Sequence, residues 1–269
     1  MKAYAKLNLA LSVGPPEQTE RGVMHPIASW MHAIDLADRV ELRPAESFDA
    51  QVTAEGFAVD WSLDADLGVR ALRALERHLG RALPARLRID KRIPPGTGLG
   101  GGSSDAAAVL KMANEAFDLG LGLDDLRAIG AGIGSDIPFF IDEGEIPGPA
   151  IVEGFGDRIT RVERSNAILL LLLPRATCPT GAVYRAYDDL GARDLRDVRG
   201  CTLATCFNDL TEAACLVAPE VGAVRDATRN ALGNQVHVTG SGSALFTFIE
   251  DPGRLSLDLG CRAIVTTLV

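Results

Sequence analysis

The sequence predicts a fold that mixes strands and helices without strict alternation. Apolar, strand-like runs occur near both ends of the chain, and helical segments lie between them. Residues 142–150 show a shift in composition toward Gly, Pro and acidic residues, which is typical of a connection between two halves. We therefore expect two domains, at residues 1–150 and 151–269.

Each predicted element follows from its local pattern. Residues 67–79 place Leu67, Leu72, Leu75 and Leu79 largely on one side, as a core-facing helix does. Residues 3–13 and 167–173 are apolar runs of strand length. We expect strands at residues 3–13, 30–42 in part, 85–89, 167–173, 235–239 and 245–249, and helices at residues 67–79, 104–117, 124–131, 182–190, 208–217 and 220–231.

The composition indicates a protein that acts on a small molecule. Of its 269 residues, 47% are hydrophobic and 23% are charged, and the formal net charge is −9. This charge argues against nucleic acid or an anionic membrane as a partner, so local groups must attract any phosphate. The run at residues 167–173 is too short to span a membrane, and a strand-like start leaves no room for a signal peptide. We expect a cytoplasmic protein and predict no oligomeric state.

The glycine-rich segment at residues 93–108 carries the strongest functional signal. Glycines permit positive φ, so successive N–H groups can face one anion, which the first turn of a following helix also favours. We expect Ser103, Ser104 and Asp105 to open that helix. The segment predicts a bound triphosphate, with ATP contacted by Pro94, Gly96, Gly98, Leu99, Gly100, Gly101, Gly102, Ser103 and Ser104.

Two other glycine-rich motifs do not fit this segment. A P-loop ends in Gly-Lys-Ser/Thr, and no Lys follows these glycines. A dinucleotide-binding fold needs an acidic residue at the end of a second strand about twenty positions on, whereas residues 121–128 are typical of a loop entering another helix. A flexible surface loop with a polar helix cap is the simple alternative.

Phosphoryl transfer also needs a group that takes up the acceptor proton and a cation that shares the transferred charge. Lys6 and Asp136 are our candidates. Lys6 lies inside an expected buried strand, and a compact ammonium beside a carboxylate would explain its position. We hypothesise that Asp136 is the general base and that Lys6 orients it and stabilises the oxygen. The alternatives are a turn or helix-terminus role for Asp136 and a Lys6 that extends from a strand edge to water.

Asn8 lies two residues beyond Lys6, on the same face of the expected strand. We expect it to line the substrate site, and the alternative is that it satisfies a neighbouring backbone group.

Three motifs, in this order, resemble the GHMP kinases: Ala-Lys-Leu-Asn-Leu at residues 5–9, the glycine loop, and Val-Thr-Gly-Ser-Gly-Ser-Ala-Leu-Phe at residues 238–246. Residues 134–140, 207–214 and 218–221 are similar to the branch that phosphorylates cytidylated methylerythritol in the non-mevalonate isoprenoid pathway. The resemblance implies an α+β fold in two lobes, with an N-terminal domain like ribosomal protein S5 domain 2, a ferredoxin-like C-terminal domain and the active site in the cleft between them. It also implies ATP as phosphoryl donor and Mg²⁺, with Ser104 as metal ligand.

The resemblance further implies a pocket for a cytosine base. Met24 stands where the family has a stacking tyrosine, His25 remains at the position that hydrogen-bonds the base edge, and Tyr184 would supply the opposite face. Gly240 and Ser241 are expected beside the substrate. The alternatives are a loop histidine, a packing aromatic and a plain hairpin turn.

Asp66 stands where the family usually has an asparagine near the adenine. An ionised Asp can accept a hydrogen bond from the adenine amine but cannot donate one, so Lys91 is a candidate donor. Asp66 could equally be only the N-cap of the helix that follows. Two other classes of function stay open: a GHMP kinase for another small alcohol, such as homoserine, mevalonate or a sugar, and a non-catalytic nucleotide-binding protein.

Overall fold

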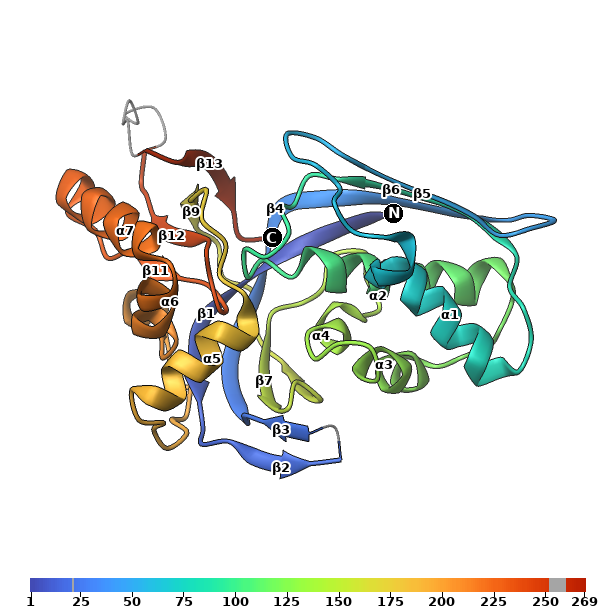
Figure 1. The fold of residues 1–269 in the computed structure, drawn as a ribbon, viewed down its shortest axis with the longest axis horizontal. Helices are drawn as coiled ribbons and strands as arrows, with labels where there is room; N and C mark the ends of the chain where they lie inside the picture. The colour runs from blue at the N-terminus through green and yellow to red at the C-terminus, as the bar shows by residue number, and fades with distance from the viewer. Residues whose placement is uncertain (21, 252–259) are drawn as a thin grey trace. The chain divides into compact units, whose positions relative to one another are not determined.

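The computed structural model of the chain describes residues 1–20, 22–251 and 260–269. The chain divides into two compact units (Figure 1). Unit 1 comprises Met1–Ala5, Leu36–Pro94 and Gly100–Gly148, and unit 2 comprises Lys6–Asp35, Pro95–Leu99 and Pro149–Val269. The chain passes between the units several times, so each unit is built from separate segments. The division into sequence domains at residue 150 stays a prediction.

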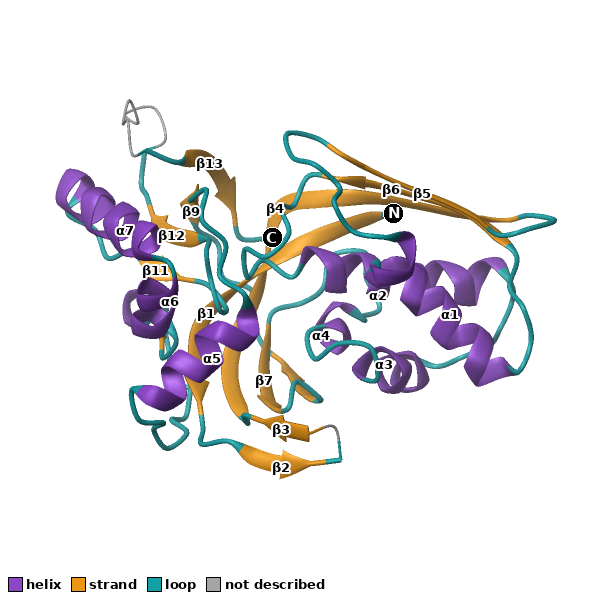
Figure 2. Ribbon diagram, in the orientation of Figure 1, coloured by secondary structure: helices purple, strands orange, loops and turns teal. Residues whose placement is uncertain are grey.

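In unit 1, helices cover one side of a small sheet. The C-terminal part of β4 (Ile27–Pro44) pairs antiparallel with β6 (Ala85–Lys91), and β6 pairs parallel with β5 (Asp49–Ala54). Helices α1 (Leu67–Leu79), α2 (Gly101–Ala116), α3 (Leu123–Ala131) and α4 (Ile137–Phe140) belong to the same unit, and Figure 2 shows them on one side of these strands.

The register of β6 places a lysine in the core of unit 1. Residues alternate between buried and exposed along this strand, and Leu87, Ile89 and Lys91 share the buried face. Ile89 packs against the start of α1, because an ideal Cβ at Gly68 would lie 2.7 Å from its Cδ1 atom. The alternation that builds the core therefore also buries the ammonium group of Lys91.

Unit 2 combines strand pairs with a separate sheet. β1 (Lys2–Val13) pairs parallel with β10 (Phe207–Asn208), the N-terminal part of β4 pairs antiparallel with β7 (Ala150–Gly154), and β7 pairs with β8 (Arg158–Arg161). The other sheet has the order β11–β12–β9–β13 and is antiparallel, with bounds His237–Val238, Leu245–Phe248, Ile168–Leu173 and Arg262–Thr267. β2 (Glu17–Thr19) and β3 (Gly22–Met24) form a hairpin.

Three helices complete unit 2: α5 (Thr180–Asp189), α6 (Thr211–Val217) and α7 (Pro219–Leu232). Val183 of α5, Leu210 at the N-cap of α6 and Val221 of α7 belong to one apolar core. The same core includes Leu172 and Leu245 from the sheet. The described residues include no helix of the length and apolarity that crossing a membrane requires.

The main helix and strand predictions are confirmed, with two corrections at element ends. Helix α2 begins at Gly101 and not at Ser104, because Gly101 and Gly102 already adopt helical geometry. The helix predicted from residue 208 begins at Thr211, because residues 207–208 pair with β1 as β10. Sequence analysis did not predict strands β5, β7, β8 and β13. They are short or partly exposed and depend on their pairing partners.

Candidate active site

The crest of the glycine loop, residues 95–99, is held within unit 2 by backbone hydrogen bonds. The N–H of Lys6 in β1 donates to the carbonyl oxygen of Leu99 at 2.9 Å. The N–H of Ala244 donates to the carbonyl oxygen of Thr97 at 3.1 Å. The motifs at residues 5–9 and 238–246 therefore both contact the glycine loop, which lies between them in the sequence.

Glycine is required in this crest for two different reasons. Gly96 and Gly98 have φ values of 68° and 76°, a region that other residues adopt only with strain. Open space surrounds Gly96, but an ideal Cβ at Gly98 would lie 2.3 Å from the carbonyl oxygen of Thr239. Gly240 approaches from the same turn, where its ideal Cβ would lie 3.1 Å from the Gly98 oxygen. The loop and the C-terminal turn thus pack backbone against backbone.

The rest of the glycine segment forms the start of α2 in unit 1. Gly100 is the N-cap with φ of 73°, and Gly101 and Gly102 are the first helical residues. A side chain at Gly101 would meet Ile93 at 2.8 Å, and one at Gly102 would meet Leu67 at 3.1 Å. Because these glycines have no side chains, Ile93 and Leu67 can pack directly against the start of the helix. The N–H groups of the first turn form the positive end of the helix dipole.

The two predicted ATP-contacting serines lie in this first turn. The N–H of Ser104 donates to the carbonyl oxygen of Gly100 at 2.9 Å, and the Ser104 side chain is buried. Ser103 is partly exposed. Among the residues that the structure describes, no group of three or more His, Cys, Asp or Glu side chains could hold a metal ion. Protein carboxylates therefore do not form a complete metal site in the described part of the chain.

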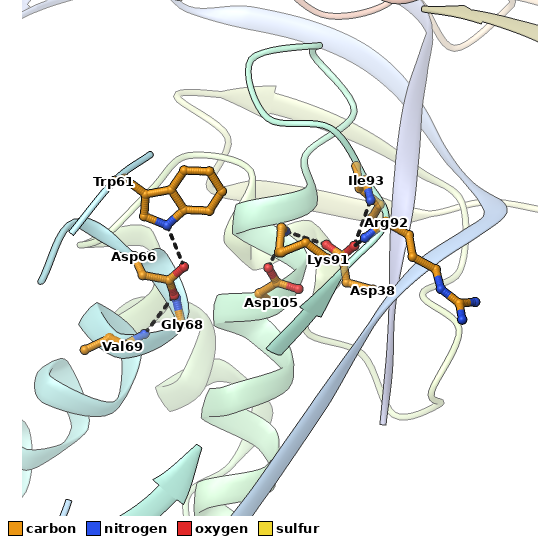
Figure 3. Close-up of polar contacts among 9 residues, drawn as sticks. All are labelled: Asp38, Trp61, Asp66, Gly68, Val69, Lys91, Arg92, Ile93 and Asp105. Carbon is orange, nitrogen blue, oxygen red and sulfur yellow. Dashed lines mark hydrogen bonds and ion pairs between the residues drawn. The ribbon is translucent and has the colours of Figure 1, made fainter. Parts of the chain in front are cut away.

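A buried ion cluster lies beneath the start of α2 (Figure 3). The ammonium group of Lys91 donates to the carboxylates of Asp38 on β4 and of Asp105 in α2, the second at 2.5 Å. Asp38 also accepts the backbone N–H groups of Arg92 and Ile93, at 2.5 and 2.8 Å. The exposed fractions of Asp38, Lys91 and Asp105 are 1%, 4% and 1%. The cluster joins three elements of unit 1 around the ends of the glycine loop.

Burial and neighbouring charge act in opposite directions on this cluster. Burial lowers the pKa of Lys91, but the two carboxylates outweigh it and the pKa is raised overall. The pKa of Asp105 is raised well above its usual range by burial, and the charges of Asp38 and Asp66 add to the effect against the opposing charge of Lys91. Lys91 therefore keeps its charge, and Asp105 holds a proton more readily than an exposed carboxyl does.

The carboxylate of Asp66 caps helix α1. Its Oδ1 atom accepts the N–H groups of Gly68 and Val69 at 2.9 and 3.2 Å, and its Oδ2 atom accepts the indole N–H of Trp61 at 3.1 Å (Figure 3). The N-cap role of Asp66 is confirmed, and whether this is its only role is not decided by the cap. Contacts of Asp66 and Lys91 with adenine stay predictions, and the structure gives both side chains partners within unit 1.

The predicted general base, Asp136, precedes the buried helix α4 in unit 1. It occupies the N-cap position with φ of −84°, yet its side chain makes no capping hydrogen bond to that helix. Its side chain is partly exposed, whereas Ile137, Pro138, Phe139 and Phe140 after it are all buried. A partly exposed carboxylate directly before a buried helix suits a group that must meet a ligand.

The predicted partner Lys6 belongs to unit 2, where it ends a chain of buried side chains. Its Nζ atom donates to Oδ1 of Asn8 at 2.5 Å, and Nδ2 of Asn8 donates to Oγ of Ser29 at 2.8 Å. The Ser29 hydroxyl in turn donates to the carbonyl oxygen of Ala10 at 2.8 Å, and the Asn8 N–H donates to Oγ1 of Thr239 at 2.9 Å. These bonds determine which way the Asn8 amide faces, so its oxygen points at the ammonium group.

The structure brings His25 and Tyr184 together in unit 2. Their ring centroids are 4.9 Å apart at an interplanar angle of 45°, and Tyr187 lies edge-on to His25 at 6.4 Å. Nε2 of His25 pairs with Asp188 of α5 at 2.8 Å. Met24, at the end of β3, is partly exposed. His25 and Tyr184 are thus neighbours, as a shared pocket requires.

The C-terminal turn is tied to helix α5 and to strand β10 of unit 2. The hydroxyl groups of Ser241 and Thr180 lie 3.1 Å apart. The side-chain amide of Asn208 donates to the carbonyl oxygens of Val238 and Gly240, both at 2.8 Å. Sequence analysis named Gly240 and Ser241, whose place beside the substrate stays a prediction, and gave no role to Asn208, although Asn208 lies in one of the recognised motifs.

The positions that sequence reasoning missed are supporting residues. Asp38, Ser29 and Thr239 touch predicted site residues. Asp38 and Ser29 lie in a strand with no distinctive local pattern, whereas Thr239 lies in the recognised C-terminal motif but was given no role. A polar residue inside an apolar strand was the only available signal at Asp38 and Ser29.

Comparisons with known proteins show what the whole chain is similar to. Residues 66–144 match the family described as GHMP kinases N terminal domain. The chain is 37% identical to 4-diphosphocytidyl-2-C-methyl-D-erythritol kinase of Caulobacter vibrioides, over 91% of this chain and 87% of that protein. It is 33% identical to the protein of the same name from Caldicellulosiruptor bescii, with coverage of 91% and 87%.

Solved structures give the same picture of the fold. A crystal structure of 4-(cytidine 5'-diphospho)-2C-methyl-D-erythritol kinase superposes with a TM-score of 0.79 at 31% identity, covering 100% of this chain and 98% of that one. Homoserine kinase from Cytophaga hutchinsonii superposes with a TM-score of 0.65 at 13% identity, covering 99% and 94%. The second likeness is one of fold alone.

Proposed function

The chain belongs to the 4-diphosphocytidyl-2-C-methyl-D-erythritol kinase family of GHMP kinases, and we propose that it phosphorylates the 2-hydroxyl of 4-diphosphocytidyl-2-C-methyl-D-erythritol with ATP. This step belongs to the non-mevalonate route to isoprenoid precursors. The observation that carries the proposal is the 37% identity that extends over 87% of the Caulobacter relative, because likeness over nearly the whole protein includes both the nucleotide and the substrate parts.

The reaction forms one bond and breaks one. The acceptor oxygen attacks the γ-phosphorus of ATP, the bond from that phosphorus to the β,γ-bridging oxygen breaks, and ADP leaves with its electron pair. The hydroxyl proton passes to Asp136, which we assign as general base. We assign Lys6, held by Asn8, to stabilise the negative charge on the transferred group. Orientation of Asp136 by Lys6 is part of the same proposal.

The glycine segment supports ATP as the donor. Gly96, Gly98 and Gly100 all have positive φ, and α2 begins directly after them. This is the backbone geometry that presents N–H groups to an anion in the absence of side chains. Mg²⁺ would offset the triphosphate charge, and such an ion is commonly held through phosphate oxygens with few protein ligands. Ser104 is the protein ligand that we propose.

The aromatic cluster supports a base-containing acceptor. His25 and Tyr184 are in ring contact, so a planar base could stack on Tyr184 while its edge meets the histidine. Met24 would take the face that an aromatic residue occupies in the family, since a thioether packs against rings.

The test is release of ADP from ATP and Mg²⁺ with 4-diphosphocytidyl-2-C-methyl-D-erythritol, run beside homoserine, mevalonate and galactose. Asp136→Asn is assayed in parallel, with Asp142→Asn as the matched control. Asp142 lies in the same unit and accepts the N–H groups of Glu143 and Gly148, so it has a structural role of its own.

We expect turnover with the cytidylated alcohol alone, loss of turnover in Asp136→Asn with ATP binding retained, and turnover in Asp142→Asn. Turnover with another of the four alcohols would move the chain to a different branch of the superfamily. ATP binding without turnover of any alcohol would favour a non-catalytic protein. Full activity of Asp136→Asn would reject the base assignment.

A further inference from the structure

The buried ion cluster lies at the two ends of the glycine loop. Lys91 is the last residue of β6, before the loop, and Asp105 is in α2, after it. Their contact at 2.5 Å closes the segment between them. Closing a flexible segment reduces the number of conformations that it can adopt. The ion pair therefore restricts the loop although neither side chain belongs to its crest.

Asp38 attaches the incoming end of the loop to the same point. Its Oδ1 atom accepts the N–H groups of Arg92 and Ile93, the two residues directly after Lys91, and its Oδ2 atom receives the ammonium. Ile93 continues the contact, because it packs against the helix start at Gly101. One side chain on β4 thus holds both the backbone before the loop and the cation that reaches the helix after it.

Burial indicates that the cluster acts through the loop. The three side chains are at most 4% exposed, and burial of such charges is costly unless each is paired. One ammonium serves two carboxylates, and the Oδ1 atom of Asp105 has no hydrogen-bond partner among the described residues. Buried ionic groups of this kind fix the geometry of the elements that they join, here the two ends of the glycine loop.

We propose that Asp38, Lys91 and Asp105 are positioning residues that hold the two ends of the glycine loop in register and so set the affinity for the triphosphate of ATP. The proposal rests on the proposed function in taking ATP as the ligand. It concerns nucleotide affinity and leaves the alcohol site untouched, so it predicts an effect on ATP that does not extend to the second substrate.

The test replaces Asp105 in the full-length protein. Asp105→Leu has a similar shape but cannot accept the Lys91 hydrogen bond, whereas Asp105→Asn still presents an oxygen to it. Binding of ATP is measured by titration calorimetry without alcohol, and KM is then measured for ATP and for the alcohol. Asn114→Ala is the matched control: Asn114 fixes the far end of α2 to Leu121 through two hydrogen bonds, so its loss lowers stability away from the loop.

We expect Asp105→Leu to weaken ATP binding about tenfold or more, as loss of a hydrogen bond to a charged group does. The KM of the alcohol should be unchanged in Asp105→Leu, and Asp105→Asn should recover most of the ATP affinity. Asn114→Ala should leave the ATP affinity and both KM values unchanged, even where it lowers thermal stability as much as Asp105→Leu does. A folded Asp105→Leu that binds ATP as the unsubstituted protein does, or no more weakly than Asn114→Ala, overturns the proposal, as does an equal loss for both substrates.

Asp38→Asn decides the matter if Asp105→Leu does not fold. An asparagine can still accept the N–H groups of Arg92 and Ile93 through its oxygen but presents its amino group to Lys91, so the proposal predicts weaker ATP binding in a folded protein. Unchanged ATP binding in that variant would overturn it. An unsubstituted protein that binds no ATP would instead reject the proposed function, which separates the two failures.

Discussion

Replacing Gly98 by alanine tests how the loop crest is held in unit 2. An added Cβ would lie 2.3 Å from the carbonyl oxygen of Thr239 and 3.2 Å from the backbone nitrogen and oxygen of Gly242. The Thr239 oxygen cannot easily retreat, because it already accepts the Gly242 N–H at 2.9 Å, and the Thr239 N–H donates to Ala244 at 3.1 Å. The backbone must therefore move apart by several tenths of an ångström.

The magnitude follows from two contributions. Alanine at positive φ costs roughly 1–2 kcal/mol, offset by about 0.4–1 kcal/mol because alanine restricts the unfolded chain. Overpacking of a close contact adds about 1–3 kcal/mol. Gly96→Ala shares the first contribution, with φ of 68°, but has no atom within 4 Å of its ideal Cβ. We expect a free energy of unfolding lower by about 1 kcal/mol for Gly96→Ala and about 2–4 kcal/mol for Gly98→Ala.

Urea unfolding followed by far-UV circular dichroism measures the difference between these two variants. If Gly98→Ala is destabilised no more than Gly96→Ala, the backbone contact between the loop and the C-terminal turn does not constrain the protein, and our account of the loop crest is wrong. A lower unfolding slope in either variant would indicate that less surface is exposed on unfolding, and the free energy of that variant is then taken from its own slope and midpoint.

Two further predictions concern buried polar groups of unit 2. Ser29→Ala leaves the Asn8 amide without its acceptor, so we expect kcat to fall about tenfold because Lys6 is misplaced. The control Thr228→Val removes a buried hydroxyl that donates to the carbonyl oxygen of Val224 in α7, and it should lower stability with kcat unchanged. Equal kcat in the two variants would contradict the role of Ser29. Burial lowers the pKa of His32 and of His237, so the unfolded chain binds protons more tightly than the folded one and stability should fall as pH drops below about 6.5. His32→Gln should reduce that loss between pH 7 and pH 5 in urea titrations, and an unchanged pH dependence in that variant would exclude His32 as a source.

Sequence patterns identified the parts of the site that depend on local chemistry. The glycine loop was recognisable because positive φ and close backbone approach both require glycine, and the structure has such φ values at Gly96, Gly98 and Gly100. Helix α1 was predicted at both ends from its apolar spacing, and Asp66, one of whose two predicted roles was the N-cap, does cap it.

Supporting residues escaped prediction because their partners are distant in sequence. Asp38 and Lys91 are 53 positions apart, and Asn8 and Thr239 are 231 apart. A carboxylate in a strand has the same local pattern whether it meets water or an ammonium group. Only the register of β4 against β6 determines that Asp38 meets Lys91.

The sequence by itself determined the glycine loop and the helix that follows it, because steric freedom and periodicity are properties of short segments. It also predicted roles for Lys6 and Asp136 from residue type and resemblance, and these roles stay predictions. The tertiary structure decided which buried charges balance one another and which carbonyl oxygens receive the loop, including the placement of Lys91 between Asp38 and Asp105. The physical reason is that hydrogen bonds and ion pairs act over a few ångströms, and only folding brings such distant residues within that range.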